Sequence, residues 1–141
     1  MSVILTADLQ ARIFAHVEST YPNEGGGFLL GTTIGDTVEI VDTIAVPNTF
    51  AAEEQYHRYA MTPQNWMKME DEADERGLTL VGYHHSHPDA APVPSEYDRQ
   101  HALPNFVYVI TSVQSSKAVE MRVWWLSKDR THMTEDTLII R

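Results

Sequence analysis

Cysteine is absent from the sequence, and its absence excludes both disulfide bonds and metal sites built from thiolates. Any transition-metal site must therefore use histidine and carboxylate ligands. The seven histidines are enough for such a site. The same absence excludes a zinc nucleoside deaminase, which needs a Cys-x-x-Cys pair beside its His-x-Glu.

Basic residues are also scarce. Lysine and arginine total 10 against 20 aspartates and glutamates, so the formal net charge is -10, and only three of the basic residues are lysines. No cluster of cations is available to neutralise a run of phosphates, and a nucleic-acid partner is not expected. The acidic excess raises solubility. It also leaves open an adaptation to a salt-rich cytoplasm, where ions screen the self-repulsion.

Long apolar runs are the third absence. No stretch approaches the ~20 apolar residues that a membrane span needs. The N-terminal segment MSVILTADLQARIF lacks a basic region followed by a long apolar run. We therefore expect no membrane partner and a soluble, cytoplasmic protein. Hydrophobic residues still make up 43% of the 141 residues, which is enough to bury the core of one domain over 1–141.

The hydrophobic pattern predicts helices interleaved with strands. Leu9, Ile13 and Val17 recur at helical spacing, and Pro63 and Ser95 stand where two further helices begin. The predicted helices span 6–19, 62–76 and 95–103, a loop spans 47–55, and the predicted strands span 24–33, 37–46, 57–61, 78–85, 106–112, 118–126 and 137–141. This order favours one mixed α/β sheet flanked by helices.

The densest chemical signal is the segment GYHHSHP, from Gly82 to Pro88. Alternate side chains of an extended segment share a face, so His85 and His87 can converge on one metal ion, while His84 faces the other way and packs. Because Pro88 cannot continue a central ladder, we expect the strand to end there and to present both imidazoles to a crevice. An incidental surface pair is the alternative interpretation of His-x-His.

Ser95 and Asp98 follow after a short, proline-rich loop over 89–94. A Ser-x-x-Asp sequence fits a helix capping box, in which the two residues bond reciprocally, and this is its structural interpretation. The loop is also short enough to swing the new helix back over the strand end, where Asp98 meets the two imidazoles. Two imidazoles and one carboxylate leave a metal ion with one vacant position, which is the layout of a catalytic zinc site.

Glu24 stands beside three glycines, Gly25 to Gly27, whose small size allows the backbone to approach a ligand closely. It is the notable candidate for the proton acceptor that hydrolysis needs. A solvated acid in a turn is the alternative, and these residues taken alone favour that alternative.

In combination, these segments resemble the JAMM metalloproteases of the MPN domain. The shared motif residues, in order and spacing, are Glu24 before GGGFLLG, then His85, Ser86, His87 and Pro88, and after six residues Ser95 and Asp98. The resemblance covers most of the chain. It implies a three-layer α/β fold similar to that of the cytidine deaminases, and hydrolysis of a peptide or isopeptide bond with Zn2+ as the cofactor.

The resemblance also implies a role for each site residue. His85, His87 and Asp98 bind the zinc ion in that pattern. Glu24 removes the proton of the bound water and returns it to the leaving amine, and Ser95 steadies the tetrahedral oxyanion.

Two features distinguish the chain within that family. Relatives often carry a cysteine two residues after the glutamate, where this chain has Gly26, a difference that concerns packing rather than activity. The chain is also short for the insertions with which eukaryotic relatives grip ubiquitin chains. It resembles the compact prokaryotic members, which implies a ubiquitin-like or sulfur-carrier protein as partner, cut at its C-terminal tail after a glycine pair. The sequence carries no signal for an oligomeric state.

Two other classes of function use parts of the same pattern. A zinc-containing MPN interaction module would bind a protein tail without cleaving it, but it needs neither Glu24 nor Ser95. A nonhaem iron oxygenase also uses two histidines and a carboxylate, usually as His-x-Asp or His-x-Glu with a distant histidine on a mainly β barrel. The ligand order here disfavours the oxygenase, so the sequence predicts a zinc metallopeptidase or isopeptidase.

Overall fold

A computed structural model of the chain describes residues 2–46 and 63–141. The strands within these residues are β1 (Ser2–Leu5), β2 (Gly26–Ile34), β3 (Thr37–Ala45), β4 (Thr79–Pro88), β5 (Val107–Gln114), β6 (Lys117–Leu126) and β7 (Met133–Ile140). The helices are α1 (Ala7–Thr20), α3 (Pro63–Glu75) and α4 (Glu96–His101). No helix in this described part is long and apolar enough to cross a membrane. The predicted loop over 47–55, the predicted strand over 57–61 and the predicted cap Thr62 lie outside the described residues.

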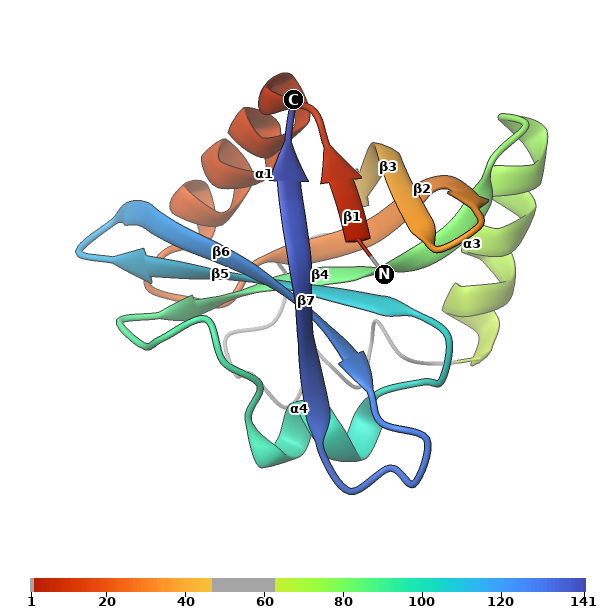
Figure 1. Cartoon of the computed structure of the whole chain (residues 1–141). Helices are drawn as coiled ribbons and strands as arrows, with labels where there is room; N and C mark the ends of the chain where they lie inside the picture. The colour runs from red at the N-terminus through yellow and green to blue at the C-terminus, as the bar shows by residue number, and fades with distance from the viewer. Residues whose placement is uncertain (1, 47–62) are drawn as a thin grey trace.

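The strands form one mixed sheet that closes on itself in the order β1-β3-β2-β4-β5-β6-β7 (Figure 1). β4 runs antiparallel to β2 on one side and parallel to β5 on the other. β1 completes the circuit, because it pairs in parallel with β3 and with β7. The predicted mixed α/β sheet with flanking helices is confirmed, whereas β1 and the closure of the sheet were not predicted.

Two clusters of buried apolar residues pack on opposite faces of the sheet. Phe28 and Leu30 belong to one cluster, and Leu29 between them belongs to the other, as alternating strand side chains require. α1 joins the cluster of Leu29 through Leu9, and α3 joins the opposite cluster through Trp66. Figure 1 also shows α1 and α4 on opposite sides of strands β4 to β6. Helices therefore cover both faces of the sheet.

The predicted elements agree with the structure in type and differ at their ends. Thr6 caps α1 by accepting a hydrogen bond from the amide of Leu9, so the helix begins one residue after the predicted start. β4 continues three residues past the predicted range of 78–85 and ends at Pro88, where the proline was expected to end it. β7 begins at Met133, four residues before the predicted start. Capping residues located the starts of α1 and α4, whereas strand ends depend on pairing partners far along the chain.

A bulge in β4 decides which face of the sheet carries the histidines. The β2–β4 register shifts by one residue between Leu29 and Leu30. As a result, Leu80 and Tyr83 belong to the same buried cluster although they are three residues apart. Alternation from Tyr83 then directs the His-x-His pair to the face that α3 and α4 cover.

Candidate metal centre

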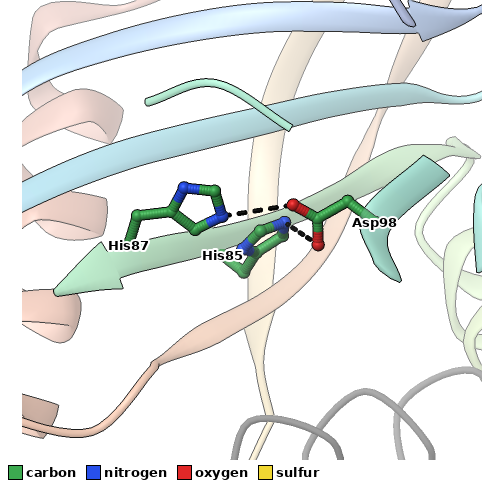
Figure 2. Close-up of side chains that lie close together, drawn as sticks. All are labelled: His85, His87 and Asp98. Carbon is green, nitrogen blue, oxygen red and sulfur yellow. Dashed lines mark hydrogen bonds and ion pairs between the residues drawn. The ribbon is translucent and has the colours of Figure 1, made fainter. Parts of the chain in front are cut away.

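Three buried side chains meet between the end of β4 and the start of α4, as Figure 2 shows. They are His85, His87 and Asp98, and their ligand atoms all lie within 4.8 Å of one another. Asp98 divides its carboxylate between the rings: Oδ1 lies 3.3 Å from Nε2 of His85, and Oδ2 lies 3.1 Å from Nε2 of His87. The structure thus brings the three predicted metal ligands together. The interpretation as an incidental surface pair is wrong, because both histidines are buried.

Asp98 also caps the helix on which it lies. The Oγ atom of Ser95 accepts a hydrogen bond of 3.1 Å from the amide of Asp98, and the amide of Ser95 donates one of 2.8 Å to Oδ2 of Asp98. The predicted capping box is therefore present in addition to the contact with the histidines. The two bonds hold the carboxylate in one orientation, which is how protein partners fix a metal ligand.

A backbone carbonyl sets the tautomer of His87. Its Nδ1 lies 2.9 Å from the carbonyl oxygen of Ala91. A carbonyl can only accept, so Nδ1 carries a proton and donates it, which leaves Nε2 as the ring nitrogen that can bind a metal ion. That nitrogen faces Asp98 inside the cluster, as a metal-ligating imidazole requires.

The charges in the cluster shift two pKa values in opposite directions. Burial raises the pKa of Asp98, but the charge and hydrogen bond of His85 outweigh burial and hold this pKa well below its usual range. Burial lowers the pKa of His85, but the carboxylates of Asp98 and Glu24 outweigh it and raise this pKa well above its usual value. Asp98 is therefore ionised at neutral pH, and His85 carries a proton that a bound cation would displace.

Glu24 lies beside this cluster, just before β2. Its side chain is buried, and Oε1 lies 3.2 Å from Nδ1 of His85, the ring nitrogen that does not face Asp98. The interpretation as a solvated turn residue is therefore wrong. A carboxylate in this place can accept a proton, and it can also orient the imidazole; the sequence pointed only to the first role.

Ser95 lies at the rim of the same site and is half-buried. Its Oγ atom is the acceptor in the capping bond, so the hydroxyl proton stays available for donation to another group. The predicted role of Ser95 toward an oxyanion remains a prediction.

His84 faces away from the cluster, as predicted. It is buried, and its ring meets that of His16 edge-on at 6.3 Å between centroids. Burial, followed by the nearby His16 and His85, lowers the pKa of His84 to about 3, so the ring is neutral. A packed histidine is the state that the sequence analysis expected.

The loop between β4 and α4 is fixed by its own carbonyl groups. Three successive carbonyls accept hydrogen bonds from Ser112, His87 and Trp124, the last at 3.0 Å from the indole nitrogen. This anchoring holds α4, and with it Asp98, against the histidines. Ser112 and Trp124 lie on other strands, and no local sequence pattern indicated that they support the site.

The residues present fit a zinc ion. Two imidazole nitrogens and one carboxylate oxygen are a usual set of three protein ligands in catalytic zinc sites, which keep one position open. A cavity of about 10 Å³ adjoins the cluster and is lined in part by His85, Asp98 and Tyr108. A space of this size admits about one water molecule.

The fold and the site together define a protein of the JAB/MPN class. Residues 6–127 match the family described as prokaryotic homologs of the JAB domain. The chain belongs to this family. The predicted membership among compact prokaryotic JAMM/MPN proteins is thereby confirmed.

Relatives with names or solved structures agree with this assignment. The chain is 31% identical over 109 residues to a desampylase of Haloferax volcanii, a match that covers 77% of this chain and 78% of the relative. A solved protein of Salinibacter ruber has 33% sequence identity and a TM-score of 0.76, covering 100% of this chain and 92% of that one. A JAB1/MPN domain protein of Archaeoglobus fulgidus has a TM-score of 0.59 at 16% identity, with 99% of both chains covered, and shows similarity of fold alone.

Proposed function

We propose that the chain, over 1–141, is a zinc-dependent hydrolase of the three-layer, cytidine-deaminase-like architecture that its family resemblance implies. It cleaves a peptide or isopeptide bond at the C-terminal tail of a ubiquitin-like or sulfur-carrier protein. The observation that carries the proposal is the buried convergence of His85, His87 and Asp98, with Glu24 at the side of the cluster. The desampylase relative supports the class of reaction, because its name denotes removal of an attached group.

Each site residue has one task in this proposal. His85, His87 and Asp98 hold the zinc ion. When bound, zinc lowers the pKa of a coordinated water toward ~7 and so supplies a nucleophile at neutral pH. Glu24 accepts the proton of the attacking water and passes it to the leaving amine, and Ser95 donates its hydroxyl proton in a hydrogen bond to the developing oxyanion.

The alternative is a zinc-containing interaction module that binds a tail without cutting it. Such a module binds zinc but needs no proton acceptor. Glu24 is buried all the same and contacts His85. A buried carboxylate at the metal site supplies that acceptor, and this feature favours the hydrolase over the binding module.

The form of β4 supports an extended tail as the substrate. Beyond Ser86, whose amide donates to the carbonyl of Gly25, the last residues of β4 pair with β5 alone among the described strands. An extended peptide can add to such an edge through its backbone. Glycines in that peptide pass where larger side chains would clash, so a glycine pair before the cleaved bond gives selectivity by exclusion.

The experiment uses small ubiquitin-like carriers that bear a peptide extension after their terminal glycine pair. The zinc-loaded protein is incubated with each carrier, and the product masses are measured. We expect release of the extension directly after Gly-Gly, and little release from matched carriers in which Gly-Gly is changed to Ala-Val. Equal cleavage of both carriers, or cleavage of unfolded peptides at the same rate, would remove this substrate and leave the hydrolase.

A further inference from the structure

Ser86 lies between the two histidines in sequence but takes no part in the cluster that they form. Strand alternation points its side chain to the opposite face of β4, where it is fully buried. Its Oγ atom accepts a hydrogen bond of 2.9 Å from the amide of Gly25, and its own amide donates one of 2.9 Å to the Gly25 carbonyl. Ser86 therefore holds Gly25 by one bond in each direction.

Gly25 is enclosed from a second side by Thr20, the last residue of α1. A Cβ atom at Gly25 would lie 2.5 Å from Oγ1 and 2.9 Å from Cγ2 of Thr20. Thr20 is itself buried and fixed, since its hydroxyl lies 3.1 Å from the carbonyl oxygen of Val17 and 3.2 Å from that of Asn23. The backbone at Gly25 is thus held between Thr20 and Ser86, in a space that admits only glycine.

The position of Glu24 depends on this arrangement. Glu24 is bonded directly to Gly25, and the strand ladder begins only at the next residue, Gly26. The pairing of β2 with its neighbours therefore does not reach Glu24. The hydrogen bonds between Ser86 and Gly25 fix the backbone next to Glu24, whose carboxylate lies 3.2 Å from the ring of His85.

We propose that Ser86 is a positioning residue, which acts through Gly25 to hold Glu24 at its working place beside the metal site. The inference rests on the proposed function and deepens it, because it assigns the serine between the two ligands to the placement of the general base. A displacement of about 1 Å in a reacting group can cost about 100-fold in rate, so a small slackening at Gly25 is enough to affect turnover.

The first test uses the metal-free protein and needs no activity. Ser86→Ala removes the acceptor of the Gly25 amide, while Ser86→Cys keeps nearly the same volume and is only a weak acceptor. Amide hydrogen exchange measured by NMR is expected to be at least about fivefold faster at Gly25 in both variants, the factor that corresponds to about 1 kcal/mol for a lost hydrogen bond. The amide of Val46, which donates to the Gly26 carbonyl, serves as the internal reference and is expected to be unchanged.

The second test measures kinetics and zinc affinity. In Ser86→Ala we expect kcat to fall about 10-fold to 100-fold, with little change in KM and in the zinc dissociation constant. Ser86→Thr keeps the hydroxyl and is expected to restore much of the rate. In a Glu24→Gln background, Ser86→Ala is expected to cost almost nothing further, because residues that act through one group are not additive.

Several results would overturn the inference. Unchanged exchange at Gly25, parental kcat in both Ser86→Ala and Ser86→Cys, or a full additional loss in the Glu24→Gln background would each do so. A fall in zinc affinity as large as the fall in kcat would show that Ser86 supports the metal ligands on β4 and not the placement of Glu24. An active parent with unaffected Ser86 variants removes this inference alone, whereas a parent that binds zinc and cleaves no carrier removes the proposed function and this inference with it.

Discussion

The carboxylate of Asp98 both caps α4 and forms part of the proposed metal site. Its Oδ2 accepts the amide proton of Ser95 and also lies 3.1 Å from His87, while Oδ1 faces His85. The helix cap and the proposed metal ligand therefore share the same side-chain orientation. Loss of a capping side chain alone costs about 0.5–2 kcal/mol, so a change at Asp98 disturbs the fold and the metal site together. The histidines are cleaner positions for testing the metal site.

His87→Ala is expected to lower zinc affinity by orders of magnitude, because one of three protein ligands is removed. Zinc binding is measured by titration of the metal-free protein, with elemental analysis of the loaded form. His132→Ala is the matched control, since His132 is exposed and its hydrogen bonds to described residues lie within its own turn. We expect the parent and the control to take up about one zinc per chain. An unchanged zinc affinity in His87→Ala would refute the assignment of this ligand.

Glu24→Gln separates the two roles that its contact with His85 permits. As a general base, Glu24 is essential for turnover, and its replacement is expected to cost about 100-fold to 10,000-fold in kcat while zinc binding and fold persist. If it only orients the imidazole, the change would instead cost about 10-fold to 100-fold in zinc affinity. Steady-state kinetics and zinc titration of the same variant distinguish the two. Retention of most of the parental kcat would end the general-base assignment.

The sequence indicated the ligands far better than the base. Strand periodicity and a short loop, which are local relations, allowed His85, His87 and Asp98 to be proposed as one site, although an incidental histidine pair and a plain capping box stayed open as alternatives. The place of Glu24 is set by bonds between Gly25 and Ser86, 61 residues apart, and local patterns carry no trace of such a contact. The neighbouring glycines made Glu24 a candidate, but only the family resemblance favoured it over a solvated turn acid, and the contact with His85 was not predicted.

At the scale of elements, the loop before α4 controls the distance between helix and strand. The indole of Trp124 on β6 donates to the carbonyl of Pro92 in that loop, and the bond is buried. Without a donor the carbonyl would be buried and unpaired, which costs about 1–3 kcal/mol. The position of Asp98 thus depends on β6, a strand that follows Asp98 in the sequence.

Trp124→Phe is therefore expected to weaken zinc binding about 10-fold and to lower the free energy of unfolding by about 1–3 kcal/mol. Trp125→Phe is the matched control on the same strand, because its indole donates to Asp136 on β7, away from the loop. The control is expected to leave zinc affinity unchanged. Equal zinc affinities in the two variants would show that the loop bond does not support the metal site.

The type of an element could be predicted where its hydrophobic pattern was long, whereas a very short strand was missed. The helix over Leu9 to Val17 and the strand before His85 carry enough periodic residues to define them. β1 has only four residues, of which Val3 and Leu5 are buried, and its role becomes visible only when it meets β3 and β7. The β4 bulge is likewise a product of pairing with β2, and no residue type announces it.

At the scale of the whole molecule, β1 makes the sheet continuous. Leu5 is fully buried within the cluster that α1 covers, and its register partners are Ile40 on β3 and Ile140 on β7. Leu5→Ala is expected to cost about 2–5 kcal/mol in the free energy of unfolding, measured with urea. Ile4→Ala, on the half-buried face of the same strand, is expected to cost clearly less. Equal small losses of the free energy of unfolding in both variants would contradict a structural role for β1 in closing the sheet.

The central claim is that zinc held by His85, His87 and Asp98 enables hydrolysis with Glu24 as the base. It is tested most directly by adding zinc stepwise to the metal-free protein and measuring, by product mass, the rate at which a carrier with a C-terminal extension is cleaved. The account predicts no cleavage without zinc, a rise in proportion to bound zinc that levels off at about one ion per chain, and no rise in His87→Ala at the same zinc concentrations. Full cleavage in the presence of a chelator, or parental rates in His87→Ala, would contradict it.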